Sequence, residues 1–322
     1  MTLINELKQK VLNEEMIEKS EALKLYNEPL EELCEAANEI RKYFCGNKFD
    51  ICTIVNAKSG KCSEDCKYCA QSAYYDTSCE EYPLISIDDM LSDAKYNQEK
   101  GVLRYSIVTS GKRLSKTEVE EVKKSVEQMK KETSIHICGS LGLLDREDYE
   151  DLYQSGMKRI HNNLETSMKN FESICTTHTF RDKVVSIEFA KNAGMEICSG
   201  GIFGVGEDIE DRIDLAISLR DLQIKSIPIN ILNPIKGTPF ENLGILSQDE
   251  IRRIIAVYRF ILPDSYIRLA GGRGLVEDKG KSCFLSGANA MITGDMLTTS
   301  GISIDTDLKM ISDLGFEVEK IG

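Results

Sequence analysis

Three cysteines stand close together in the segment KCSEDCKYCAQ, residues 61–71. Cys62, Cys66 and Cys69 form a C-x3-C-x2-C pattern, and thiolates this close in sequence can bind one metal centre. An odd number of cysteines cannot pair completely as disulfides. A structural zinc site takes four ligands, usually in two separated pairs, and no second pair follows at that spacing; zinc or free thiols are the alternatives. A cubane of four irons also takes four ligands, so the triplet predicts a 4Fe–4S cluster with one iron left open for a substrate.

The triplet resembles the signature of the radical S-adenosylmethionine superfamily in spacing and in context. The resemblance implies that the amino and carboxylate groups of S-adenosylmethionine chelate the open iron. An electron from the cluster then cleaves the sulfonium to a 5′-deoxyadenosyl radical, so the three cysteines are expected to be catalytic. An electron donor such as flavodoxin or ferredoxin is an expected partner.

The composition narrows the classes of function. The chain has 322 residues and a net charge of −13, which disfavours a nucleic-acid partner because phosphates would be repelled. The start MTLINELKQK lacks an apolar core, so no signal peptide is expected, and no apolar run of about 18 residues predicts a membrane span. Eleven cysteines without a secretion signal indicate metal chemistry in a reducing, cytoplasmic setting.

The N-terminal part of the chain reads as helical. Residues 3–25 are charged, with Ile4, Leu7 and Val11 on one stripe, and a second helix is expected from about Pro29 to Gly46. Cys34 lies on the apolar stripe of that second helix, which predicts a buried thiol. We therefore expect an N-terminal helical cap over residues 1–46.

From Phe49 onward, short strands alternate with amphipathic segments such as 117–132 and 182–193. Eight repeated strand–helix units predict an α/β fold, a (β/α)8 TIM-type barrel with N-terminal capping helices, over residues 47–322. A doubly wound open sheet is the alternative. The expected strands are 49–55, 103–109, 134–139, 158–163, 195–199, 226–232, 266–270 and 290–294.

Several of these strands have an unusual second face. A barrel lumen that serves only as a core is filled with Val, Ile and Leu, but here one face of five strands is polar or sulfur-bearing. Burying such groups unpaired would cost a few kcal/mol each, which a bound cofactor would offset. The members of this face are Arg104, Ser106, His136, Cys138, Glu196, Cys198, Ser226, Pro228, Asn230, Tyr266 and Arg268.

Over about residues 28–318 the sequence resembles the biotin synthases. The stretches that carry the resemblance are KCSEDCKYCAQS, HNNLETS, ICSGGIFGVGE, SIPINILNPIKGTPF, YIRLAGGRG and CFLSGANAMITGDMLTT. The resemblance implies a (β/α)8 sulfurtransferase that converts dethiobiotin to biotin. Two hydrogen abstractions each consume one S-adenosylmethionine, and a second, sacrificed iron–sulfur cluster deep in the barrel supplies the sulfur. It also implies a homodimer.

The resemblance assigns roles to single residues. Tyr68 matches the aromatic residue that packs on the adenine, although a plain packing role is an equal alternative. Asn163 and Glu165 match contacts to the ribose of S-adenosylmethionine, with Asn163 also near the substrate's ureido ring; the family more often has Asp where Glu165 stands. Asn230 matches a contact to the ureido group, and an amide can both donate to and accept from a cyclic urea. A strand-end cap is its alternative.

The auxiliary cluster of the family is 2Fe–2S, held by three cysteines and an arginine. Cys138 and Cys198 match two of those cysteines, and Arg268 matches the arginine, but Ser106 stands at the third cysteine position. The family commonly has serine where Cys52 stands, and we expect strand 49–55 to place Cys52 beside Ser106. The sequence therefore predicts that Cys52, Cys138, Cys198 and Arg268 hold a 2Fe–2S cluster or a variant of it. A buried Cys52 thiol, with the cluster completed by Ser106 or an exogenous ligand, is the alternative.

The remaining groups have plainer interpretations. Cys175 precedes a TTHTF loop and is expected to serve neither cluster, and the three histidines show no metal-binding spacing.

Two rival functions share part of the sequence pattern. The first is another radical barrel enzyme, such as an iron-hydrogenase maturase or methylornithine synthase, and the second is an iron–sulfur electron-transfer protein. An electron carrier needs neither an open iron nor substrate-binding amides.

Overall fold

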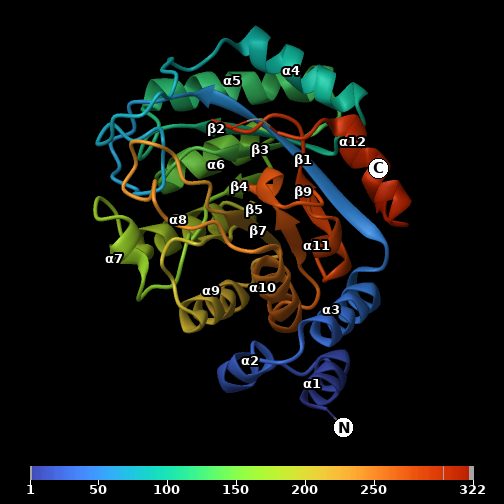
Figure 1. Cartoon of the computed structure of the whole chain (residues 1–322). Helices are drawn as coiled ribbons and strands as arrows, with labels where there is room; N and C mark the ends of the chain where they lie inside the picture. The colour runs from blue at the N-terminus through green and yellow to red at the C-terminus, as the bar shows by residue number, and fades with distance from the viewer. Residues whose placement is uncertain (1, 300, 319–322) are drawn as a thin grey trace.

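Eight parallel strands close into a barrel in this computed structural model, which describes residues 2–299 and 301–318 (Figure 1). The order around the barrel is β1-β2-β3-β4-β5-β7-β8-β9, and a pairing of β1 with β9 closes it, so the open-sheet alternative is wrong. The strands are β1 Lys48–Lys58, β2 Arg104–Thr109, β3 His136–Ser140, β4 Arg159–His161, β5 Glu196–Cys198, β6 Gly201–Phe203, β7 Ser226–Ile231, β8 Tyr266–Leu269, β9 Ala290–Ile292 and β10 Glu317–Val318.

Helices surround the barrel and connect successive strands (Figure 1). They are α1 Leu3–Leu12, α2 Lys19–Leu25, α3 Leu30–Cys45, α4 Ile87–Glu99, α5 Lys116–Glu132, α6 Arg146–Ser155, α7 Phe171–Ile174, α8 Phe180–Asn192, α9 Ile209–Asp221, α10 Gln248–Ile261, α11 Lys281–Leu285 and α12 Ile304–Asp313, with a 3-10 turn η1 at Arg273–Leu275. None of the described helices is long and apolar enough to cross a membrane.

All eight predicted barrel strands are present, and two elements were missed. Strand β6 follows β5 after a two-residue break, and both pair with β7. At this break Gly200 approaches β7 so closely that an added Cβ would lie 1.9 Å from the Pro228 oxygen, so only glycine fits. The second missed strand, β10, pairs with the start of β1 through Lys48 and Glu317.

The outer helices begin where their sequence signals stand. Ser115 and Thr179 form capping boxes with the third residues of α5 and α8, as Asp208 does for α9. Their side chains satisfy backbone N–H groups that a helix start leaves without partners. The predicted helices 117–132 and 182–193 are thus confirmed as α5 and α8, with ends shifted by one or two residues.

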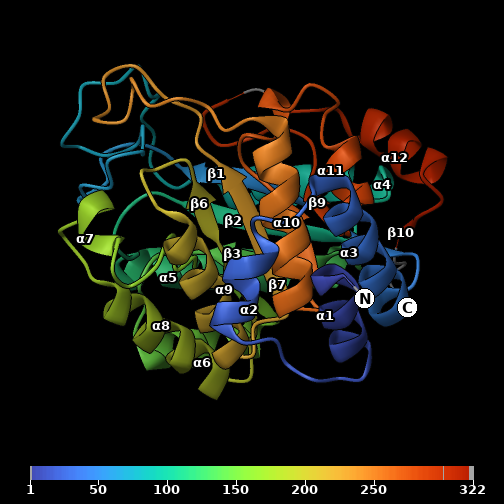
Figure 2. The same cartoon turned by 60° about the horizontal axis from the view of Figure 1, so that its bottom comes forward.

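Three helices precede the barrel rather than the expected two. The predicted helical segment 3–25 is interrupted between α1 and α2, where Glu14 adopts a positive φ of 64° that ends α1. The helix α3 ends at Gly46 as predicted, and Cys34 is buried. These helices pack against α10 on the outside of the barrel (Figure 2), where Arg253 donates to the Tyr26 and Glu28 carbonyl oxygens.

Candidate active site

The cysteine triplet lies on the loop that leaves the carboxyl end of β1, the end where barrel enzymes bind their ligands. Backbone hydrogen bonds fix its shape: Cys62 N–H donates to the Gln71 oxygen at 2.9 Å, and Cys69 N–H donates to the Cys66 oxygen at 3.0 Å. All three cysteines are half-buried. In the described part of the chain their sulfurs are not all within 4.8 Å of one another. Sulfurs so spaced suit three different irons of a cluster better than one ion.

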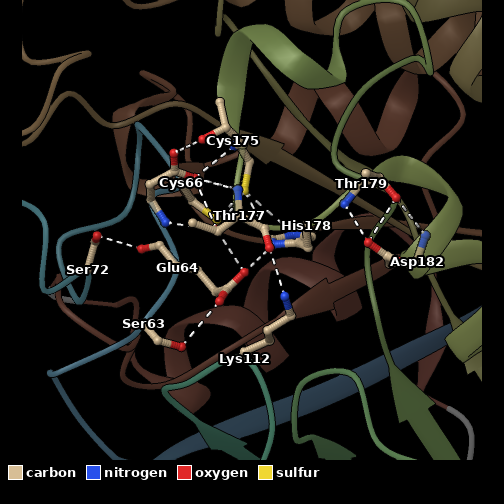
Figure 3. A network of polar contacts seen from close by, with 12 residues as sticks. Ser63, Glu64, Cys66, Ser72, Lys112, Cys175, Thr177, His178, Thr179 and Asp182 are labelled. Carbon is tan, nitrogen blue, oxygen red and sulfur yellow. Dashed lines mark hydrogen bonds and ion pairs between the residues drawn. The ribbon is translucent and has the colours of Figure 1, made fainter.

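A second loop, residues 175–179 after α7, is joined to the triplet loop by polar contacts (Figure 3). Lys67 N–H donates to the Ile174 oxygen at 2.9 Å, and Thr176 N–H donates to Asp65 Oδ1 at 2.8 Å. Glu64 Oε2 accepts from the Thr177 hydroxyl at 2.8 Å and lies 2.6 Å from His178 Nδ1. The triplet loop is therefore held by a neighbouring loop before any cofactor arrives.

Cys175, which the sequence predicts to serve neither cluster, sits inside this network beside the triplet. Its sulfur is 3.7 Å from that of Cys66. Their hydrogen bond lowers the pKa of Cys175 to about 4 and raises the pKa of Cys66. No local sequence pattern could predict this contact, because 109 residues separate the two cysteines.

The barrel encloses a cavity of about 340 Å³ at the same end. Seven members of the predicted polar face line it: Arg104, Ser106, Cys138, Cys198, Pro228, Asn230 and Arg268. The other four, His136, Glu196, Ser226 and Tyr266, are the first residues of β3, β5, β7 and β8 and do not line the cavity. Tyr68, Asn163 and Glu165 also line it, so the cavity reaches from the triplet loop to the lumen.

Three thiols share the cavity, on β1, β3 and β5. Burial raises the pKa of Cys52 to about 12 and also raises the pKa of Cys138. Burial would raise the pKa of Cys198 as well, but a hydrogen bond from His161 and the nearby positive charges lower it to about 6. The Ser226 hydroxyl donates to Cys198 Sγ at 3.3 Å.

The expected pairing of Cys52 with Ser106 is wrong in register. Cys52 pairs with Arg104, whereas Ser106 pairs with Ile54 on one side and with Cys138 on the other. Cys52 and Ser106 nevertheless both line the cavity. The predicted alternation of side chains along strand 49–55 was correct, because Cys52 and Ile54 both line the cavity.

A buried carboxylate organises the arginines beside these thiols. Asp50 accepts from Arg268 Nη2 at 2.7 Å and from Arg104 Nε at 2.8 Å, and Arg159 Nη1 lies 3.8 Å away. Burial would raise the pKa of Asp50, but the three guanidinium groups outweigh burial and lower it to about 2. Glu196 pairs with Arg159 at 2.6 Å. Two carboxylates thus face three guanidiniums, leaving excess positive charge beside the thiols.

Sequence reasoning missed Asp50, Arg159 and His161 as parts of this site. The alternation of strand 158–163 could have indicated two of them, because Arg159 and His161 share the face of Asn163. The role of Asp50 had no signal in its own strand, since its partners come from β2, β4 and β8.

The side-chain amides of Asn230 and Asn163, both predicted to bind substrate, already form hydrogen bonds with the protein backbone. Asn230 donates to the Gly201 oxygen at 3.0 Å and accepts from Gly271 N–H at 2.9 Å. Asn163 Oδ1 accepts from Gly200 N–H at 3.0 Å. Each amide retains hydrogen-bonding capacity toward the cavity, because an amide has two donors and two acceptor lone pairs. The strand-end role expected as the alternative for Asn230 is therefore real.

Tyr68, on the triplet loop, and Glu165 both line the cavity. Glu165 has a φ of 72°, a left-handed conformation that Asp and Asn adopt more readily than Glu. Its backbone N–H donates to the Gly200 oxygen at 3.1 Å, and its oxygen accepts from Ile202 N–H at 2.8 Å. These two bonds hold the strained residue in place at the cavity.

These donor sets fit two iron–sulfur clusters. The lower thiols, like the triplet, are not all within 4.8 Å of one another in the described residues, so they suit several irons rather than one ion. The excess of guanidinium charge around Cys52, Cys138 and Cys198 suits an anionic, thiolate-ligated group.

Two family models match the chain. The radical SAM superfamily matches residues 57–219, and the biotin and thiamin synthesis associated domain matches residues 228–317. The first covers the triplet, and the second covers Asn230 and Arg268.

Proteins named biotin synthase are similar over nearly their whole length. The one from Brachyspira hyodysenteriae is 58% identical over 98% of this chain and 95% of its own. The one from Clostridium botulinum strain Loch Maree is 54% identical, over 99% and 100%. The one from Akkermansia muciniphila is 51% identical, over 99% of each.

Two solved structures share the fold at low identity. Methylornithine synthase has a TM-score of 0.85 and 19% identity, over 98% of each chain. The FeFe-hydrogenase maturase HydG from Carboxydothermus hydrogenoformans has a TM-score of 0.83 and 17% identity, over 98% of this chain and 79% of its own. The rival enzymes suggested by the sequence therefore have the same barrel, whereas the similarity over the full sequence is to biotin synthases.

Proposed function

The chain belongs to the biotin synthase family of radical S-adenosylmethionine enzymes, and from this premise we propose which of its residues carry each part of the reaction. The reaction inserts sulfur into dethiobiotin to give biotin. The observation that carries the assignment to residues is one cavity whose wall contains three thiols, three guanidiniums and three amides, together with Tyr68 of the triplet loop.

When bound, the 4Fe–4S cluster and S-adenosylmethionine supply the hydrogen-abstracting radical, and an auxiliary cluster supplies the sulfur. Cys62, Cys66 and Cys69 would hold the first cluster. Tyr68 and Glu165, which line the cavity, would contact S-adenosylmethionine, Tyr68 at the adenine and Glu165 at the ribose hydroxyls. The shape of their loops, fixed by backbone hydrogen bonds, is available before binding.

The auxiliary cluster, 2Fe–2S or a variant, would be held by Cys52, Cys138 and Cys198, with Arg268 as an additional ligand. Support comes from the shared cavity and from the charge on Arg268, whose pairing with Asp50 at 2.7 Å fixes the guanidinium in place. Ser106 is the competing ligand, and its register pairing with Cys138 keeps it close to the same site.

Dethiobiotin would lie between the two clusters, in a cavity of about 340 Å³ that has the size of a small-molecule site. Asn163 and Asn230 would bind its ureido ring through the amide donors and acceptors that their hydrogen bonds to the backbone leave unused. The apolar part of the wall, including Ile54 and Ile202, suits an alkyl chain. The barrel excludes water from a carbon radical.

Several further expectations remain proposals. An electron donor such as flavodoxin or ferredoxin, a homodimer and a cytoplasmic location each suit a reductive enzyme whose eleven cysteines are all free. The division into a helical cap over 1–46 and a barrel over 47–322 is also a proposal, and residues 319–322 lie outside the described part.

Reconstituting the chain anaerobically with iron and sulfide tests the assignment. Iron and sulfide analysis with Mössbauer spectroscopy should show two distinct clusters, and dethiobiotin should stimulate 5′-deoxyadenosine release and yield biotin. A fully loaded chain that gives no stimulation by dethiobiotin would contradict the substrate. Reduction that never releases 5′-deoxyadenosine would favour an electron carrier.

A further inference from the structure

The contact between the triplet loop and the 175–179 loop brings together three groups that bind metals: the thiols of Cys66 and Cys175 and the imidazole of His178 (Figure 3). Their ligand atoms all lie within 4.8 Å of one another. We propose that these three residues form a binding site for a single thiophilic divalent cation of the zinc class in the chain that has not received its 4Fe–4S cluster.

The distances match those between ligands of one tetrahedral ion. Two sulfurs bound at about 2.3 Å at tetrahedral angles lie about 3.8 Å apart, and a sulfur and an imidazole nitrogen lie about 3.6 Å apart. The sulfurs of Cys66 and Cys175 are 3.7 Å apart, and His178 Nε2 is 3.9 Å from Cys175 Sγ. The two distances from Cys175 Sγ therefore match those of a tetrahedral ion within a few tenths of an ångström, and Cys66 and His178 have ligand atoms within 4.8 Å of each other.

Glu64 orients the imidazole for this role. Its Oε2 lies 2.6 Å from His178 Nδ1, and both side chains are buried. A histidine that binds a metal through one ring nitrogen usually donates the N–H of the other to a carboxylate, which fixes the ring and its tautomer. The pair of Glu64 and His178 has this arrangement: Nδ1, which also lies 3.3 Å from Cys175 Sγ, faces the carboxylate, and Nε2 is left as the ligand atom.

The site is preorganised by its surroundings. Asp65 accepts from the backbone N–H groups of Thr176 and Thr177, at 2.8 and 3.2 Å, and Lys112 donates to the Thr177 oxygen at 2.7 Å. These bonds fix the loop that carries Cys175 and His178 against the loop that carries Cys66. An ion would therefore meet three ligands in place, with a fourth position left for water.

The site shares one ligand with the cluster. Cys66 is a cluster ligand in the proposed function, and on that premise the single ion and the 4Fe–4S cluster exclude each other. Zn²⁺ bound here would block cluster assembly, and Fe²⁺ bound here would be delivered directly beside the triplet. The existence of the site itself does not depend on that premise.

Titrating the iron-free, full-length chain with Co²⁺ under argon tests the site. Tetrahedral thiolate-bound Co²⁺ gives thiolate charge-transfer and strong visible ligand-field absorption. We expect one such ion per chain that is lost in Cys175→Ser and His178→Ala and retained in Cys62→Ser and Cys69→Ser. Loss with Cys62→Ser and Cys69→Ser but not with Cys175→Ser would overturn the proposal, because the triplet alone would then bind the ion.

The lower thiols need a matched control, because they could bind Co²⁺ as well. The signal should persist in Cys138→Ala and disappear in Cys175→Ser, and the reverse result would also overturn the proposal. Circular dichroism establishes that each variant is folded. A Cys175→Ala variant that is folded yet still binds Co²⁺ with unchanged affinity and spectrum would contradict the site.

Competition during cluster assembly tests the exclusion separately. One equivalent of Zn²⁺ added before iron and sulfide should slow formation of the 4Fe–4S absorption in the wild-type chain by at least about tenfold, and Cys175→Ser should remove most of this delay. Equal inhibition in both chains would contradict the exclusion. Failure of the wild-type chain to form a cluster without Zn²⁺ would instead count against the proposed function.

Discussion

The two sulfur-rich regions of this barrel are built in opposite ways. The upper one, the triplet loop, lies on irregular backbone, with half-buried thiols and the carboxylates of Glu64 and Asp65 beside them. The lower one is built from strand residues, and guanidinium groups surround it. Loops supply the thiols of the first region, whereas barrel strands supply those of the second.

The difference matches the role proposed for each region. A cluster that chelates an incoming cofactor needs access from solvent and a loop that can close around the ligand. A sulfur donor must face one carbon of the substrate at a fixed distance, which residues on strands provide. The surplus of guanidinium charge around the lower thiols would also stabilise an anionic group there, in place of the water that stabilises exposed charges.

The largest effect is expected from a substitution that disables the upper region and leaves the lower one intact. Cys66→Ala should abolish cleavage of S-adenosylmethionine, because the first cluster loses a ligand, while the iron bound at the lower thiols remains. Release of 5′-deoxyadenosine and Mössbauer spectra of the reconstituted chain measure both. Cleavage at the wild-type rate would show that the triplet has been misinterpreted.

Removing a lower ligand should give the converse result. Cys52→Ser should lose the auxiliary cluster and biotin formation, because a serine hydroxyl is a poor iron ligand beside thiolates, and it should spare cleavage of S-adenosylmethionine. Iron content per chain and 5′-deoxyadenosine release are the readouts. Cys283→Ser, which replaces a buried thiol outside both regions, is the matched control. Full retention of the auxiliary iron in Cys52→Ser would favour Ser106 or an exogenous ligand.

The charge balance of the lower region depends on Asp50. Asp50→Asn leaves buried guanidiniums without their carboxylate, and breaking such a buried network costs about 3–5 kcal/mol. Chemical denaturation of the cluster-free chain measures the loss. Glu39→Gln, at an exposed ion pair with Lys8, should cost less than about 1 kcal/mol. Equal stability of wild type and Asp50→Asn would mean that the carboxylate does not organise the arginines.

Asp50 also predicts how stability depends on pH. Its pKa is lowered to about 2 in the folded chain, from 3.8, so its stabilisation is complete above pH 4 and is lost as the pH falls toward 2. This amounts to about 2 kcal/mol over that window. Denaturation between pH 5 and 3 should show a shallower pH dependence in Asp50→Asn than in the wild type. Identical slopes would contradict this contribution.

The smallest effect concerns the substrate amides between the two regions. Asn230→Ala should weaken stimulation by dethiobiotin by about 1–3 kcal/mol, the cost of losing a buried hydrogen-bond partner. The concentration of dethiobiotin that gives half-maximal 5′-deoxyadenosine release measures it. Because Asn230 also bonds Gly201 and Gly271, thermal unfolding must be measured in parallel. A loss of stability with unchanged dethiobiotin dependence would leave Asn230 a strand-end cap only.

Local patterns sufficed to predict the barrel and much of its lumen. The amphipathic spacing of segments such as 117–132 and the strand alternation of Arg104 and Ser106 act within a few residues, and both were interpreted correctly. The contact between Cys66 and Cys175 and the convergence of three arginines on Asp50 could not be predicted in this way. These contacts join segments far apart in sequence, and strand register, which placed Cys52 beside Arg104 instead of Ser106, is set by the whole closed sheet.

The seam between β1 and β9 determines the order in which the two regions can form during synthesis. The upper loops meet once residue 178 has been made, whereas Asp50 pairs with Ala290 across the seam, and Lys48 pairs with Glu317. At about 5–20 residues per second, the ribosome takes on the order of tens of seconds to synthesise the residues between Asp50 and Ala290. Until then, the thiol of Cys52 has no lumen to face and is open to oxidants and stray metals. The region proposed to hold the auxiliary cluster therefore cannot close until residue 290 has been made, well after the upper loops can meet.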